Sequence, residues 1–263
     1  MKSTIVLAAV LFLWAATPAP GRGATSGSPL LRGATFVVDP GHGTKYPDGS
    51  QLNVGAVGPG GVEEQKVALD VGEDLAALLR AAGAKVVLTR SHAHPYRIGT
   101  VLRLDNRARA ALANKLGATA FLAIHADSSL AASSHGTSVF WLKPNSVAFA
   151  NALRKRLASL NLGESEFKAR DLAVTSEATV PAALVELGFV SNPHEEQLLA
   201  TPAFQHQEAQ VLYQAILDTF GTAPAHGAGS PGPGAIGGHA APISGPGSPG
   251  PGAIGGHAAP ISK

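Results

Sequence analysis

Cysteine is absent from the 263-residue sequence, which excludes disulfide bonds, thiolate metal sites and a cysteine nucleophile. Any metal ion would have to be held by histidine and carboxylate side chains, a donor set that suits zinc. Charge of one sign is also scarce, because 20 Lys and Arg face 18 Asp and Glu, for a formal net charge of +2. No basic block is present, so the sequence gives no sign of nucleic-acid binding.

The N-terminal apolar stretch, Ile5–Ala16, is too short for an ordinary membrane span. It follows Lys2 and precedes small, turn-forming residues, so residues 1–27 are typical of a secretory signal. An uncleaved anchor is the alternative, and the cleavage position is not readable. We expect export, to the periplasm or to the cell wall and exterior, with no membrane contact after cleavage.

The C-terminal segment, residues 221–263, consists largely of Gly, Pro, Ala and Ser. Gly229–Ser244 recurs word for word at Gly247–Ser262, an offset of 247 − 229 = 18 residues. With almost no large side chains the segment cannot bury a core, so we expect a disordered tail. The remaining length is enough for one well-buried domain, which we place at residues 34–220.

Two apolar segments are each followed by a histidine. Thr35–Val38 is typical of a buried strand and leads into Asp39–Gly43 (DPGHG), which places His42 on a tight turn. Thr119–Ile124 is a second such strand, followed at once by His125. Either histidine alone could be structural or solvated. If the strands are parallel neighbours, both histidines lie at the carboxyl edge of the sheet, where ligands bind in open α/β folds.

Two carboxylates complete a candidate site. Glu64 lies in the first turn of a predicted helix, where the helix dipole alone would favour it. Glu186 follows the apolar run Pro181–Val185, and burying a carboxylate there is costly unless it is paired or functional. Two histidines and one carboxylate can hold zinc with a fourth position open to water. A second carboxylate could take that water's proton and pass it to a leaving amine.

Apolar periodicity predicts the remaining elements: helices over Val62–Gly83, Val101–Leu116, Ser146–Leu160 and Phe204–Phe220, and strands over Ala84–Thr89 and Gly136–Leu142.

Several polar residues outside the candidate site are given a structural interpretation. A solvated helix face is expected to carry Arg103, Arg107 and Arg109. His92 and His94 are expected to be exposed loop histidines. The Gly-rich loop Lys45–Gly61 lacks the Lys-Ser/Thr of a phosphate loop, so nucleotide binding is not expected. Asp39 and Asp127 are candidates to fix the second ring nitrogens of the two site histidines.

Several motifs together resemble the zinc-dependent N-acetylmuramoyl-L-alanine amidases of the amidase 3 family. They are DPGHG at 39–43, GAVG at 55–58, Glu64 with Leu69-Asp70, Thr89-Arg90, AIHAD at 123–127 and PAALVELGFVSN at 181–192. The resemblance spans about 34–220. It implies a twisted, mostly parallel sheet with helices on both faces. It also implies a zinc ion held by His42, Glu64 (rather than Glu63) and His125, with Glu186 as the catalytic carboxylate.

The family cleaves the amide between the lactyl group of N-acetylmuramic acid and L-alanine of the stem peptide, so the implied substrate is peptidoglycan. Ser91–His94 departs from the family, which often has an acidic residue there, and this leaves substrate contacts at that loop open. The connections after His125 and after Leu142 look too short for an inhibitory helix, so we expect an open site. A zinc peptidase that cuts within the stem peptide, or a non-catalytic wall-binding protein, would be the alternatives. No protein partner is indicated.

Overall fold

The strand order of the main sheet is β4-β1-β6-β9-β7-β8. The computed structural model describes residues 30–45, 52–95, 97–98 and 102–222; the predicted signal, residues 1–27, and the repeated tail from residue 223 onward lie outside them. The strands of this sheet are β1 (Thr35–Pro40), β4 (Lys85–Leu88), β6 (Ala120–Asp127), β7 (Thr137–Trp141), β8 (Glu164–Ala169) and β9 (Ala182–Phe189). A small second sheet has the order β3-β2-β5, from β2 (Thr44–Lys45), β3 (Leu52–Asn53) and β5 (Arg97–Ile98).

All neighbours in the main sheet are parallel except β7 and β9, which are antiparallel. The helices are α1 (Glu64–Ala81), α2 (Leu102–Lys115), α3 (Val147–Leu157), α4 (Ala173–Glu177), α5 (Pro193–Leu199) and α6 (Pro202–Phe220), with 3-10 turns at Pro144–Ser146 and Ala158–Leu160. None of the helices in the described ranges is long and apolar enough to cross a membrane. The predicted mostly parallel α/β fold is therefore confirmed.

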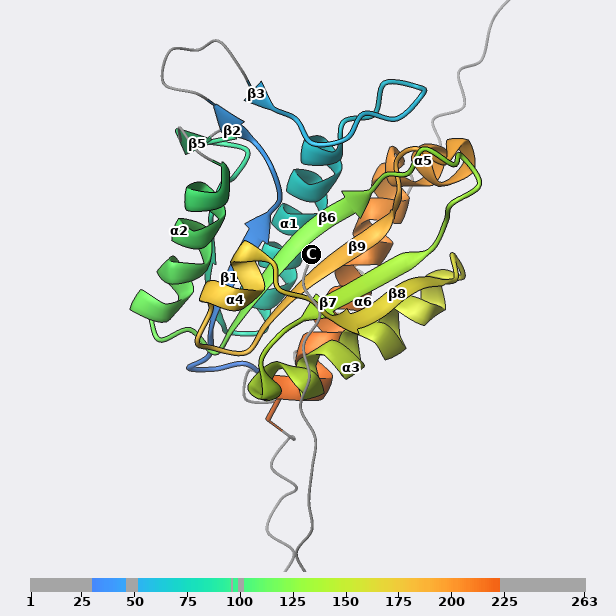
Figure 1. Ribbon diagram of the computed structural model, residues 1–263. Helices are drawn as coiled ribbons and strands as arrows, with labels where there is room; N and C mark the ends of the chain where they lie inside the picture. The colour runs from blue at the N-terminus through green and yellow to red at the C-terminus, as the bar shows by residue number, and fades with distance from the viewer. Residues whose placement is uncertain (1–29, 46–51, 96, 99–101, 223–263) are drawn as a thin grey trace, which may run out of the picture. The chain divides into compact units, whose positions relative to one another are not determined.

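Alternate side chains of the central strands enter two different cores, because successive residues of a strand point to opposite faces. Phe36 and Val38 pack with α1, α3 and α6, whereas Val37 packs with α2 and α4. Figure 1 shows α4 in front of the sheet and α3 and α6 behind it. Burial on both faces explains the continuous apolar runs of β6 and β9.

The structure adds and extends elements relative to the sequence prediction. Strand β8 was not predicted, because it is a mostly exposed edge strand whose charged and polar residues form no apolar run. Strands β6 and β9 also continue past the predicted ends, so His125 and Glu186 lie inside strands and not after them. The two residues are register partners across the β6–β9 pair, just before a bulge at 125–127. The pairing brings both side chains to one face of the sheet.

Candidate metal centre

The turn after β1 holds His42 in an unusual backbone conformation. His42 has φ +60° and Gly43 has φ +69°, a left-handed region that is uncommon for non-glycine residues. Position 41 requires glycine because of the space it leaves, not because of its φ angle. Its amide donates to the carbonyl of Ile124, and a Cβ there would lie 2.4 Å from Cε1 of His125. The missing side chain lets the His125 ring lie directly on the turn.

A buried arginine holds this turn from α2. Arg109 is 1% exposed; it donates to the carbonyls of Pro40 (3.1 Å) and His42 (2.6 Å) and pairs with Asp39 (2.9 Å) and Asp105 (2.8 Å). The prediction of a solvated Arg109 was therefore wrong, although Arg107 on the same helix is exposed. The i,i+4 spacing of Asp105 and Arg109 was the available signal.

A second arginine, Arg90 after β4, braces the same turn. It is 2% exposed and donates to the carbonyls of Pro40 (2.9 Å), Gly41 (2.6 Å) and Gln65 (2.5 Å). Guanidinium groups suit this task because their donors are fixed in a planar fork. Sequence reasoning noted Arg90 within a family motif but gave it no role, since its acceptors are backbone carbonyls of remote residues.

Glu64 is anchored in the first turn of α1. Its Oε2 accepts a hydrogen bond from the Ala56 amide at 2.9 Å, and Gly55 makes room for it, because a Cβ there would lie 2.4 Å from that oxygen. Burial favours a raised pKa of Glu64, but hydrogen bonds with His125 and then His42 hold the pKa well below its ordinary value of 4.5. The carboxylate is therefore ionised, the form in which it can bind a cation.

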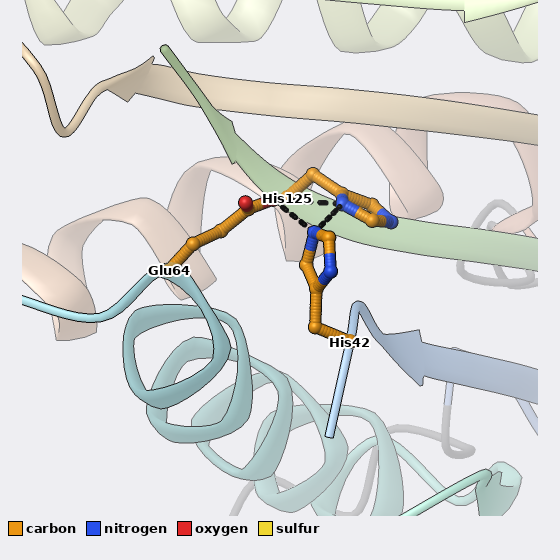
Figure 2. A group of neighbouring side chains, drawn as sticks. All are labelled: His42, Glu64 and His125. Carbon is orange, nitrogen blue, oxygen red and sulfur yellow. Dashed lines mark hydrogen bonds and ion pairs between the residues drawn. The ribbon is translucent and has the colours of Figure 1, made fainter. Parts of the chain in front are cut away.

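His42, Glu64 and His125 converge on one point, and Figure 2 shows their side chains turned toward one another from the β1 turn, helix α1 and strand β6. Glu64 Oε1 lies 2.8 Å from His42 Nε2 and 2.8 Å from His125 Nδ1, and the two nitrogens are 3.2 Å apart. Tetrahedral zinc ligands are separated by about 3.3 Å, from metal–ligand bonds of about 2.0–2.1 Å. The donor set and its spacing fit a metal ion.

The second ring nitrogen of His42 is fixed by Asn53, not by Asp39. His42 Nδ1 lies 3.2 Å from Asn53 Oδ1. Asp39 is instead engaged by Arg109 and by the hydroxyl of Thr89, so its predicted role was wrong. The predicted role of Asp127 was also wrong: its Oδ1 accepts from the Ser128 amide, and no hydrogen bond joins it to His125 among the described residues.

Glu186 lies beside the three ligands on β9. Its Oε2 is buried and has no hydrogen-bond partner among the described residues. Burial, followed by the negative charges of Glu64 and Asp127, raises the pKa of Glu186 well above its ordinary value, and Arg170 opposes the shift. The alternative of a structural ion pair is not supported, since Glu186 has no salt bridge in the described ranges. A carboxyl held ready to carry a proton is typical of an acid–base residue.

A pocket of about 650 Å³ contains the three converging side chains and Glu186, together with residues of β7, α4 and the loop after β8. His92 lies away from it: it is exposed and pairs with Asp70 at 2.8 Å. His94 is exposed as well, and both expectations for this loop are confirmed. The connection from Ser128 to Gly136 contains no helix, and Ser128 lines the pocket rim.

The comparisons with known proteins agree with this geometry. The family model described as "Amidase_3: N-acetylmuramoyl-L-alanine amidase" matches residues 36–218. Among curated proteins, "Probable cell wall amidase LytH" of Staphylococcus epidermidis is 30% identical over 192 residues, which is 72% of this chain and 57% of that protein. The chain thus spans less than two thirds of this relative, and 60% of its Staphylococcus saprophyticus counterpart.

Two solved structures of amidases match over nearly their whole lengths. The catalytic domain of CwlV, an N-acetylmuramoyl-L-alanine amidase from Bacillus (Paenibacillus) polymyxa, is 32% identical with a TM-score of 0.61, over 71% of this chain and 99% of that one. The N-acetylmuramoyl-L-alanine amidase AmiC2 of Nostoc punctiforme is 28% identical with a TM-score of 0.61, over 70% and 96%. The similarity therefore covers the entire domain that carries the candidate site.

Proposed function

Because the chain belongs to the amidase 3 family of N-acetylmuramoyl-L-alanine amidases, we propose that it is a zinc-dependent peptidoglycan hydrolase. The bond cleaved is the amide between the lactyl group of N-acetylmuramic acid and L-alanine of the stem peptide. The observation that carries the proposal is the convergence of His42, Glu64 and His125 on one point. Glu186 lies on the neighbouring strand of the same pocket, and its Oε2 has no hydrogen-bond partner among the described residues.

The three converging side chains are the proposed metal ligands. Two imidazoles and one carboxylate are a common zinc set, and the chain has no cysteine to offer instead. A zinc ion bound there would polarise the scissile carbonyl and lower the pKa of water. The protein contributes the preorganisation: Arg90 and Arg109 fix the turn carrying His42, Asn53 orients its ring, and the Ala56 amide holds Glu64.

Glu186 is the proposed acid–base residue. It accepts the proton of the water that attacks the amide carbonyl, and delivers it to the nitrogen of L-alanine as the carbon–nitrogen bond breaks. An unpaired oxygen leaves its carboxylate free for that exchange. The raised pKa suits the transfer, because the protonated form is not strongly disfavoured before it donates to the amine.

The proposed substrate lies outside the cytoplasm, and an exported protein would meet it. The N-terminal residues 1–27 remain a proposed secretory signal, and the destination is the periplasm or the cell wall and exterior. The tail, residues 221–263, remains a proposed disordered extension. Among the described residues, those that line the pocket fall between His42 and Glu186.

The test combines metal analysis of the pure protein with identification of products from digested sacculi. About one zinc per chain, and free stem peptides with an L-alanine amino terminus, would support the amidase. Peptides cut within the stem would identify a zinc peptidase instead. A protein that binds sacculi, holds the metal and releases nothing would be a non-catalytic wall-binding protein.

A further inference from the structure

The pocket extends from Glu186 to the positively charged side chain of Arg170. In sheet order, His125 lies on β6, Glu186 on β9 and Phe140 on β7, and Arg170 directly follows the edge strand β8. All four residues line the same pocket. Arg170 therefore lies on the far side of Glu186 from the proposed metal ligands, across two neighbouring strands.

The backbone of Arg170 is fixed while its side chain remains available. Its amide donates to the carbonyl of Trp141 at 2.7 Å, and its carbonyl accepts from the hydroxyl of Thr175 at 2.8 Å. The guanidinium stacks over Phe140, 5.0 Å from the ring centroid. Its one ion-pair contact among the described residues is Glu166, at 4.0 Å, and the side chain is 51% exposed. Most of its donors are therefore free to bind an anion.

The pocket floor between Glu186 and Arg170 is apolar. Phe140 and Leu184 are buried in it, and Val174 and Leu172 of the α4 region close it. Such a floor can bind a small aliphatic side chain, and the single guanidinium at its edge can donate hydrogen bonds to a carboxylate. The combination suits a peptide that carries an acidic residue next to a small apolar one.

The chemistry of the proposed reaction indicates which end of the substrate lies there. In the proposed reaction Glu186 donates a proton to the leaving amine, so the nitrogen of L-alanine must lie beside Glu186. The stem peptide then extends away from the metal ligands, over the apolar floor. We propose that Arg170 binds a carboxylate on the residue that follows L-alanine, and that it makes the enzyme prefer an acidic stem peptide over an amidated one. This inference rests on the proposed amidase function.

The experiment uses two soluble muramyl peptides that differ only in a carboxylate or a carboxamide on the residue after L-alanine. Arg170→Gln should lower kcat/KM for the carboxylate probe about five- to tenfold through KM, the range for a half-exposed charged hydrogen bond. For the carboxamide probe it should change kcat/KM less than about twofold, since no ionised oxygen is lost. Arg170→Lys should restore part of the preference. Lys155→Gln removes an exposed cation of α3; it is the matched control and should have no effect on either probe.

The controls separate the possible failures. Zinc content and thermal unfolding of the Arg170 variants should equal those of the wild type, because the side chain is exposed. An equal loss on both probes would show that Arg170 acts through Glu186 or through packing on Phe140, and would overturn the inference. An unchanged preference would also overturn it. Wild-type protein that holds zinc but cleaves neither probe nor sacculi would refute the amidase function itself.

Discussion

Arg109→Met tests whether the buried ion network, and not the turn sequence alone, positions His42. The substitution removes two buried ion pairs and both donors to the Pro40 and His42 carbonyls. Asp39 and Asp105, 1% and 7% exposed, would remain buried without the ion pair that each makes with Arg109. Breaking a buried pair in this way costs about 3–5 kcal/mol. At about 2–4 °C per kcal/mol for a domain of this size, the apparent Tm should fall by about 6–20 °C.

Thermal unfolding with a chelator present measures the cost to the fold without metal linkage. Zinc titration of the folded protein measures the second effect, which we expect to be about a 10- to 100-fold loss of affinity, as for other residues that orient metal ligands. Arg107→Met, on the exposed side of the same helix, is the matched control and should shift stability by less than about 0.5 kcal/mol. If Arg109→Met melts within about 2 °C of the wild type and binds zinc normally, the proposed positioning role is refuted.

Four further predictions follow from the same contacts. Glu186→Gln should retain zinc and lose about 10²–10⁴-fold in turnover on sacculi, and normal turnover would remove Glu186 from the mechanism. Asn53→Ala should weaken zinc binding about 10- to 100-fold by freeing the His42 ring, with little change in the melting of the metal-free protein. Burial, followed by the charge of Glu195, raises the pKa of Glu208 well above its ordinary value of 4.5. The stability that protonated Glu208 contributes is therefore present at low pH, and it is lost as the pH rises from about 4.5 through the pKa of the folded state. Glu208→Gln should therefore gain stability relative to the wild type between pH 5 and pH 8, and a pH-independent difference in Tm would contradict this. Purified protein should digest sacculi with no added activator, because the described β6–β7 connection forms no helix over the pocket; inertness until a second protein is added would refute that expectation.

The sequence was sufficient to identify the candidate site because each of its side chains is attached to a strong local pattern. His42 follows a Pro-Gly stop. His125 and Glu186 lie in short apolar runs that are typical of buried strands. Parallel pairing then places them together, as the register of His125 with Glu186 shows. The choice of Glu64 over Glu63 came from the family resemblance, since both lie at the start of the same helix and local physics does not separate them.

Two buried carboxylates of α5 illustrate what no local pattern reveals. Glu195 accepts from the amides of Gly136 and Phe189, and Glu196 accepts from those of Gly60 and Val62. In sequence they are an ordinary acidic pair in the first turn of a short helix. Their partners include loop amides up to 136 residues away and the Phe189 amide of β9. Only the folded chain therefore shows that the two carboxylates connect the Gly-rich loop to the sheet.

The sequence by itself determined the fold class, most of the main strands and helices, and the residue types gathered at the candidate site. Periodicity and turn chemistry act over a few residues, and most segments of the chain carry them clearly. Only the tertiary structure decided which polar groups support that site: Arg109 and Arg90 beneath the turn, Asn53 beside the His42 ring and Arg170 at the far end of the pocket. An arginine or asparagine has the same local signature whether it is solvated or buried, and its partner is chosen by packing between distant segments.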